Sequence, residues 1–101
     1  MNGSNLRDLT DLDRVIHEPA RLLIVSYLAL VEEADFLFLL HETDLTRGNL
    51  SSHLSKLEEA GYVEIEKGFV GKKPQTLCRI TPAGRDALQQ YRHVLKAALA
   101  L

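Results

Sequence analysis

Apolar residues recur along much of the chain at steps of three and four, the spacing that gathers side chains on one face of a helix. This pattern predicts a short amphipathic helix over residues 6–17 and a second, mostly buried helix from Pro19 to Val31. Pro19 suits the first turn of a helix and disfavours helix in the residue before it, so the two helices are expected to be separate. A polar turn is expected over residues 32–35, after which Asp35 can cap a third, short helix.

Residues 46–61 carry the most informative pattern. Leu50, Leu54 and Leu57 lie at steps of four and three on one helical stripe, and the remaining positions are mostly polar. Thr46 can cap the first turn, and Gly61 can adopt the left-handed conformation that ends the helix. The pattern therefore predicts a helix with one buried face and one free face. Because any packed amphipathic helix shows such a leucine stripe, only the free face points to a function.

Beyond residue 61 the period changes from helical to alternating. Apolar and polar positions alternate over 62–66 and 77–80, which predicts two half-buried strands around a loop over 68–75. Thr81 can cap a last helix and Pro82 suits its first turn; its apolar stripe continues to the C-terminus. The predicted fold is mainly α with a small β-hairpin.

Composition narrows the class of protein. A chain of 101 residues with 46% hydrophobic content fits one domain with a real core. No apolar run approaches the roughly 18 residues of a membrane span, and the start lacks a basic-then-apolar export signal, so a cytoplasmic protein is expected. Cys78 is the only cysteine, which excludes an internal disulfide and a cysteine-based zinc cluster and favours a small buried hydrophobe.

The charge is unevenly distributed, although the net charge is only −2. Residues 1–44 hold three basic and nine acidic side chains, whereas residues 45–101 hold nine basic and five acidic ones. The segment from Lys67 to Arg79, both included, holds four positive charges and no acid. A polyanion responds to this local distribution more than to the total, so the basic segment is a candidate binding surface.

The sequence shows no sign of metal or catalytic chemistry. The four histidines, at positions 17, 41, 53 and 93, have no spacing typical of metal ligands, and His53 is expected to be a backbone-facing residue or one at the edge of the core. No glycine-rich phosphate loop, serine-histidine-acid set or carboxylate pair can be placed. We therefore expect neither a metal site, a cofactor nor an enzyme.

The order of predicted elements is that of a winged helix-turn-helix, and several stretches closely resemble the MarR-like winged-helix transcriptional regulators, in their short single-domain branch. The matching stretches are residues 17–22, 35–36, 48–63, the basic loop through Lys73 and Pro74, and residues 80–85. The resemblance implies one domain over 1–101, with an N-terminal helix at 6–17, a winged-helix core at 19–81 and a C-terminal dimerisation helix at 82–101. The chain departs from the family's usual pattern at Leu37, Phe38 and Leu40, which are apolar, and at Arg47, where an acidic residue is common.

The resemblance also implies which residues contact DNA. A recognition helix over about 46–60 would enter the major groove, and a wing over about 67–76 would lie on the backbone or in the minor groove. Three serines within five residues are poor helix formers, which favours a contact surface over a purely structural one. The candidate DNA-binding residues are Thr46, Arg47, Asn49, Ser51, Ser52, Ser55, Lys56, Lys72, Lys73 and Gln75.

A homodimer on a pseudo-palindromic operator is the assembly that this reading implies, because one domain contacts few base pairs. The expected dimer interface comprises apolar residues of the first and last helices: Leu6, Leu9, Leu12, Ile16, Leu88, Tyr91, Leu95 and Leu99. Two alternatives stay open. One is a winged-helix adaptor that binds proteins without specific DNA binding; the other is a sensor with a small-molecule effector near the dimerising helices, which their shortness does not favour.

Overall fold

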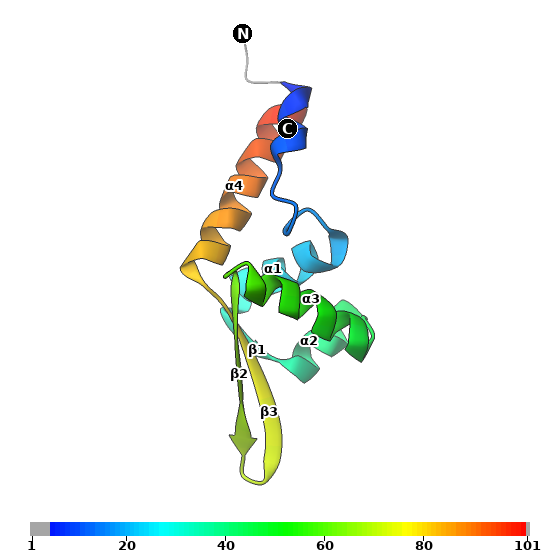
Figure 1. The fold of residues 1–101 in the computed structure, drawn as a ribbon, viewed down its shortest axis with the longest axis vertical. Coiled ribbons are helices and arrows are strands. Elements are labelled where there is room, and N and C mark those ends of the chain that lie inside the picture. Colours follow the sequence, from blue (N-terminus) through cyan, green and yellow to red (C-terminus); the bar gives the residue numbers. More distant parts are fainter. Residues whose placement is uncertain (1–4, 101) are drawn as a thin grey trace.

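Eight elements follow one another in the computed structural model, which describes residues 5–100 (Figure 1). Residues 1–4 and 101 of the predicted domain lie outside the described residues. The elements are a 3-10 helix η1 (Leu6–Asp11), α1 (Pro19–Val31), β1 (Glu33–Asp35), α2 (Phe36–Thr43), α3 (Arg47–Glu59), β2 (Val63–Val70), β3 (Lys73–Ile80) and α4 (Pro82–Leu99). The mainly helical fold with a small sheet is confirmed.

Side-chain caps set where the helices begin, as the sequence predicted. Asp35 accepts a hydrogen bond from the backbone N–H of Phe38 at 2.7 Å and starts α2. Thr46 and Thr81 act in the same way at the starts of α3 and α4. At the end of α3, Gly61 has a φ of +80°, the left-handed conformation that glycine adopts at no steric cost.

The sheet has three antiparallel strands in the order β1-β3-β2, and the expected polar turn at 32–35 is wrong. Residues 33–35 instead pair with β3, and Ala34 lies opposite Cys78. Ala34 is buried while Glu33 is exposed, so buried and exposed side chains alternate along this short edge strand. The partner of this strand lies more than forty residues away, and local polarity could not show it.

The wing is a longer hairpin than predicted. Strands β2 and β3 extend to Val70 and Lys73, so the expected loop over 68–75 shrinks to the two residues between them. Gly71, the first of these, has a φ of +63°, which suits a two-residue hairpin turn with glycine in its first position. The hairpin projects from the helices along the long axis of the molecule (Figure 1).

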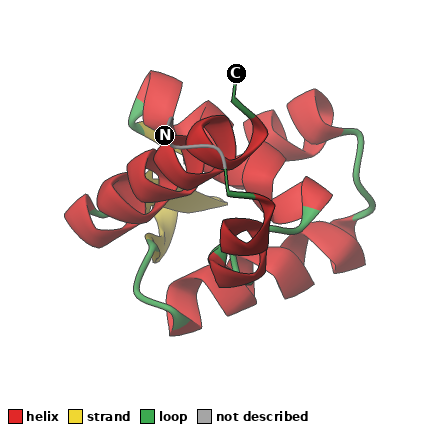
Figure 2. Ribbon diagram, turned by 90° about the horizontal axis from the view of Figure 1, so that it is seen from above, coloured by secondary structure: helices red, strands yellow, loops and turns green. Residues whose placement is uncertain are grey.

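The core lies where α1, α3 and the sheet meet, and the helices gather around and over the strands (Figure 2). Leu50 and Leu57 of α3 are fully buried, as are Ile24 and Leu28 of α1. Cys78 is also fully buried, and this burial raises the pKa of its thiol to about 11. The predicted leucine stripe therefore anchors α3 to the body of the protein.

The predicted N-terminal helix over 6–17 is wrong beyond its first turns. η1 ends at Asp11, and Leu12 is extended. The Asp13 carboxylate accepts hydrogen bonds from the backbone N–H groups of Val15 and Ile16, at 2.8 and 3.1 Å. An aspartate that bonds its own following backbone competes with the helix, which explains the break.

The same segment covers part of the expected dimer interface within one chain. Leu12, Ile16, Leu88 and Tyr91 are buried within one chain, because the N-terminal segment packs against α4 of the same molecule. Those four side chains are core residues and not free surface. Leu9 and Leu95 are half-buried, and only Leu6 and Leu99 of the predicted set are exposed.

A tyrosine titration tests how the N-terminal segment is held. The Tyr62 hydroxyl donates a hydrogen bond to Asp13, and this bond, burial and the charge of Asp13 raise the pKa of Tyr62 to about 12. Because the folded-state pKa lies above the ordinary value of 10.0, the stability from this contact is present below about pH 10 and is lost between pH 10 and 12. Replacing Asp13 with alanine should lower this pKa toward 10.0, measured by tyrosinate absorbance with Tyr62→Phe to assign the step. An unchanged titration would contradict the contact.

Candidate nucleic-acid interface

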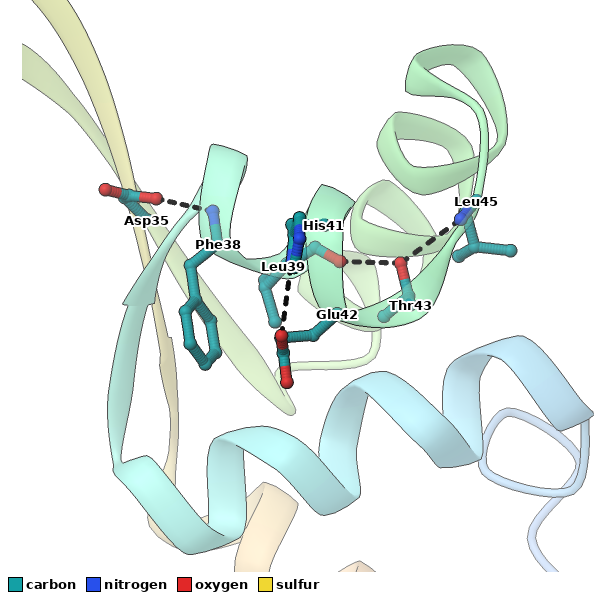
Figure 3. Close-up of polar contacts among 7 residues, drawn as sticks. All are labelled: Asp35, Phe38, Leu39, His41, Glu42, Thr43 and Leu45. Atoms are coloured by element: carbon teal, nitrogen blue, oxygen red, sulfur yellow. Dashed lines mark hydrogen bonds and ion pairs between the residues drawn. The ribbon is translucent and has the colours of Figure 1, made fainter.

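A short turn joins α2 to α3 and fixes the angle between them. The Thr43 hydroxyl, which is buried, donates to the carbonyl oxygen of Leu39 at 2.6 Å and accepts from the N–H of Leu45 at 3.5 Å (Figure 3). Asp44 then takes a left-handed conformation with a φ of 57°. These contacts end α2 and direct the chain into α3, which gives the predicted helix-turn-helix.

The free face of α3 is exposed, as a contact surface requires. All seven predicted contact residues of this segment are exposed: Thr46, Arg47, Asn49, Ser51, Ser52, Ser55 and Lys56. The Thr46 hydroxyl already serves the helix by accepting a hydrogen bond from the N–H of Asn49 at 3.1 Å. The first turn contains no acidic residue, so the positive end of the helix dipole is not offset there.

An open groove of about 620 Å³ runs between α3 and the wing. Ser51 and Ser55 line it from the helix, and Lys67 and Thr76 line it from the strands. Ser52 and Lys56 lie four residues apart on the side of α3 that points away from the core. Two of the predicted serines and Lys67 thus line the same groove. Lys67 belongs to the basic segment but was not predicted to contact DNA.

The other predicted wing residues lie farther along the hairpin. Lys72 is in the turn and Lys73 begins β3, and both are exposed. Gln75 is half-buried and lies in β3 opposite Gly68, not in a loop. The hairpin therefore carries its two adjacent lysines at the tip, away from the body of the protein (Figure 1).

Arg79 does not contribute to the basic surface, in contrast to the sequence-based expectation. It donates hydrogen bonds to Glu66 at 2.5 Å and to Glu33 at 2.6 Å. These bonds raise the pKa of Arg79 above its ordinary value. The three side chains come from β3, β2 and β1, so the ion pairs join the strands and neutralise this arginine. Besides Arg79, the positive charges of the wing are those of Lys67, Lys72 and Lys73, and all three side chains are exposed.

Polar contacts at the edge of the core hold α3 against the start of α1, and the sequence did not predict them. Arg21 Nη1 lies 3.2 Å from Nδ1 of His53, and Arg21 Nε donates to the carbonyl oxygen of Val15 at 2.6 Å. The Glu18 carboxylate lies 3.8 Å from the same histidine nitrogen. His53 is half-buried, in agreement with its predicted place at the edge of the core. No local pattern pairs residues 32 positions apart.

Within residues 5–100, none of the helices has the length and apolar character that a membrane span needs. Within the same range, no group of three or more histidine, cysteine, aspartate or glutamate side chains is placed to hold a metal ion.

A family described as the winged helix DNA-binding domain matches residues 20–99. The chain belongs to this family. An uncharacterized protein of Methanocaldococcus jannaschii is 36% identical to it over 78 residues, which cover 77% of this chain and 85% of the relative.

Solved structures have the same fold as this winged-helix protein. The transcriptional regulator homologue from Pyrococcus horikoshii OT3 superposes with a TM-score of 0.86 at 30% identity, over 93% of this chain and 95% of that one. A MarR-family transcriptional regulator from Silicibacter pomeroyi has a TM-score of 0.65 at 19% identity, over 94% of this chain and 62% of that one. The predicted winged-helix fold, which the MarR-family structure shares, is confirmed, and the matching family is one of DNA-binding domains.

Proposed function

We propose that this winged-helix protein is a transcriptional regulator that binds specific double-stranded DNA as a homodimer in the cytoplasm. The observation that carries the proposal is the division of α3: Leu50, Leu54 and Leu57 are buried, while its polar residues are exposed next to a basic wing. A B-DNA major groove about 12 Å wide admits such a helix. The similarity to the transcriptional regulator homologue supports the same role.

The first two turns of α3 would read the bases. Arg47 can form two hydrogen bonds with O6 and N7 of guanine, and Asn49 can do the same with N6 and N7 of adenine. Ser52 lies one turn further on the exposed face and can reach a base edge or a phosphate. Ser51 and Ser55, which line the groove toward the wing, would contact the adjacent DNA backbone.

The wing would add affinity with little sequence information. Lys67, Lys72 and Lys73 are exposed along the hairpin, and lysines that neutralise phosphates release counterions from DNA. Gln75, half-buried in β3, would make a secondary contact at most.

The homodimer would form at the end of the molecule opposite the wing, where the described ends of the chain lie together (Figure 1). Leu6 and Leu99 are exposed there, by 65% and 43%, and Leu9 and Leu95 are half-buried beside them. These four residues replace the eight predicted ones as the proposed interface. A two-fold pair would place two copies of α3 on half-sites about one helical turn apart.

The salt dependence of duplex binding tests the proposal. A duplex selected from a random pool should bind with an affinity that falls as salt rises, and Lys72→Ala and Lys73→Ala should each reduce the slope by about one unit. Fluorescence anisotropy at several salt concentrations measures both effects. Arg92→Ala, an exposed residue of α4, is the control and should leave the slope unchanged. A protein that selects no duplex, or binds with no salt dependence, would refute DNA binding as the function.

A second candidate function, a protein-binding adaptor, is favoured by the apolar surface of α1 and α2. Leu30 and Leu37 are 81% and 60% exposed, and the Phe38 ring contacts Tyr27 in an edge-to-face arrangement with ring centroids 6.5 Å apart. Grouped apolar side chains on a surface often mark protein contacts. Duplex binding without salt dependence would favour this reading over DNA recognition.

A further inference from the structure

The wing tip combines exposed apolar side chains with positive charge. Phe69 is 74% exposed and Val70 is 60% exposed at the end of β2, and Lys72 and Lys73 follow directly after the turn. An aromatic ring at the end of a projecting hairpin adds nothing to the core of this chain. Burying such a ring in a partner is favourable, so the tip has the composition of a contact surface.

The register of the hairpin shows which way Phe69 faces. Lys67 pairs with Thr76 and Phe69 pairs with Pro74, and alternate residues of a strand lie on the same face. Lys67 and Thr76 line the groove beside α3, so Phe69 and Pro74 continue that same face about 7 Å farther toward the tip. Val70, one residue later, lies on the opposite face. The aromatic ring is therefore on the side of the wing that faces the recognition helix.

Charge identifies the kind of partner. Lys67 precedes the ring and Lys73 follows it, and no acidic residue lies between Lys67 and Arg79. A second copy of this positively charged hairpin would be repelled, whereas a duplex offers phosphates for the lysines and stacked bases for the ring. With α3 in the major groove, the wing would reach the adjacent minor groove.

We propose that Phe69, backed by Pro74, is an apolar wedge that enters the minor groove, partly unstacks one base step and bends the duplex. The proposal rests on the proposed function and adds to it a source of sequence preference outside the bases read by α3. Pyrimidine–purine steps are the easiest to unstack, so the wedge should favour such a step at the position below the wing. Lys67, which lies on the same face as Phe69, would hold a flanking phosphate.

The test measures bending with a selected duplex that carries a fluorophore at each end. The wild-type protein should shorten the end-to-end distance, as energy transfer reports. Phe69→Ala should abolish the bend and weaken binding on the order of tenfold, while the salt slope stays the same because no charge is removed. Phe69→Leu, which keeps an apolar wedge, should restore most of the bend. Val70→Ala is the matched control on the opposite face and should bend DNA as the wild type does.

A second experiment uses a duplex in which the pyrimidine–purine step beneath the wing is replaced by a stiff A-tract step. This change should weaken binding of the wild type but not of Phe69→Ala. The wedge is refuted if Phe69→Ala still bends the duplex, if it loses affinity with no change in the bend, or if it changes the oligomeric mass measured by sedimentation. DNA binding survives each of these results. Failure of the wild-type protein to select any duplex would instead refute the proposed function itself.

Discussion

Replacing Gly84 with alanine should lower the free energy of unfolding by about 3 kcal/mol. A Cβ at this position would lie 2.2 Å from the carbonyl oxygen of Tyr62 and 3.0 Å from Cγ1 of Ile80. The closer neighbour is backbone, which cannot rotate away, so the first turn of α4 must shift from the start of β2. Urea denaturation followed by circular dichroism measures the loss.

Gly48 provides a matched control, because it lies in the first turn of α3 as Gly84 lies in the first turn of α4. A Cβ at Gly48 would meet no atom within 4 Å. Gly48→Ala should therefore keep or raise stability, by up to about 1 kcal/mol from the better helix propensity of alanine. Equal stability of Gly84→Ala and the wild type would show that α4 does not press against β2 as described.

The contact at Gly84 belongs to a junction that joins the end of α3 to the start of α4. The Thr81 hydroxyl donates to the carbonyl oxygen of Gly61 at 2.6 Å, and the Thr81 N–H donates to that of Tyr62 at 3.0 Å. In the sequence, Gly84 stands out only as part of residues 80–85, a stretch that resembles the MarR-like family. The structure supplies a physical reason for its glycine, which is space for a neighbouring backbone.

Features with a local cause could be predicted from the sequence. Asp35, Thr46 and Thr81 cap their helices because the acceptor oxygen and the N–H that it satisfies lie within three residues. The buried stripe of α3 follows from its spacing alone. The exposure of the candidate contact residues on α3 follows in turn, because they occupy the remaining positions of the same helix.

Features that depend on distant partners could not be predicted. Glu33 is polar and exposed, yet it lies in a strand because β3 pairs with it. Arg79 was assigned to the basic surface, and only the fold shows that Glu33 and Glu66 neutralise it. Arg21 contacts His53 across two helices, and its place in the sequence gives no sign of this. The burial of half of the expected dimer interface has the same origin, since the apolar stripes of the two terminal segments cover each other within one chain.

Leu57→Ala and Arg47→Ala should have opposite effects on stability and on DNA binding, although both residues lie on α3. Leu57 is fully buried, so its truncation should lower the free energy of unfolding by about 2 to 5 kcal/mol through lost burial and the cavity left behind. Arg47 is exposed in the first turn, near the positive end of the helix. Its removal should leave the free energy of unfolding unchanged or raise it by about 0.3 kcal/mol.

DNA affinity should follow the reverse order. Arg47→Ala should weaken binding to a selected duplex by about 1 to 3 kcal/mol and weaken binding to random duplex by less, because a two-point contact with guanine discriminates between bases. Leu57→Ala, measured well below its melting temperature, should retain the preference for the selected duplex because no reading side chain is lost. Equal losses for Arg47→Ala on both duplexes would make it a phosphate contact. A large loss of stability in Arg47→Ala would contradict the division of α3 into an anchoring face and a reading face, on which the proposed function depends.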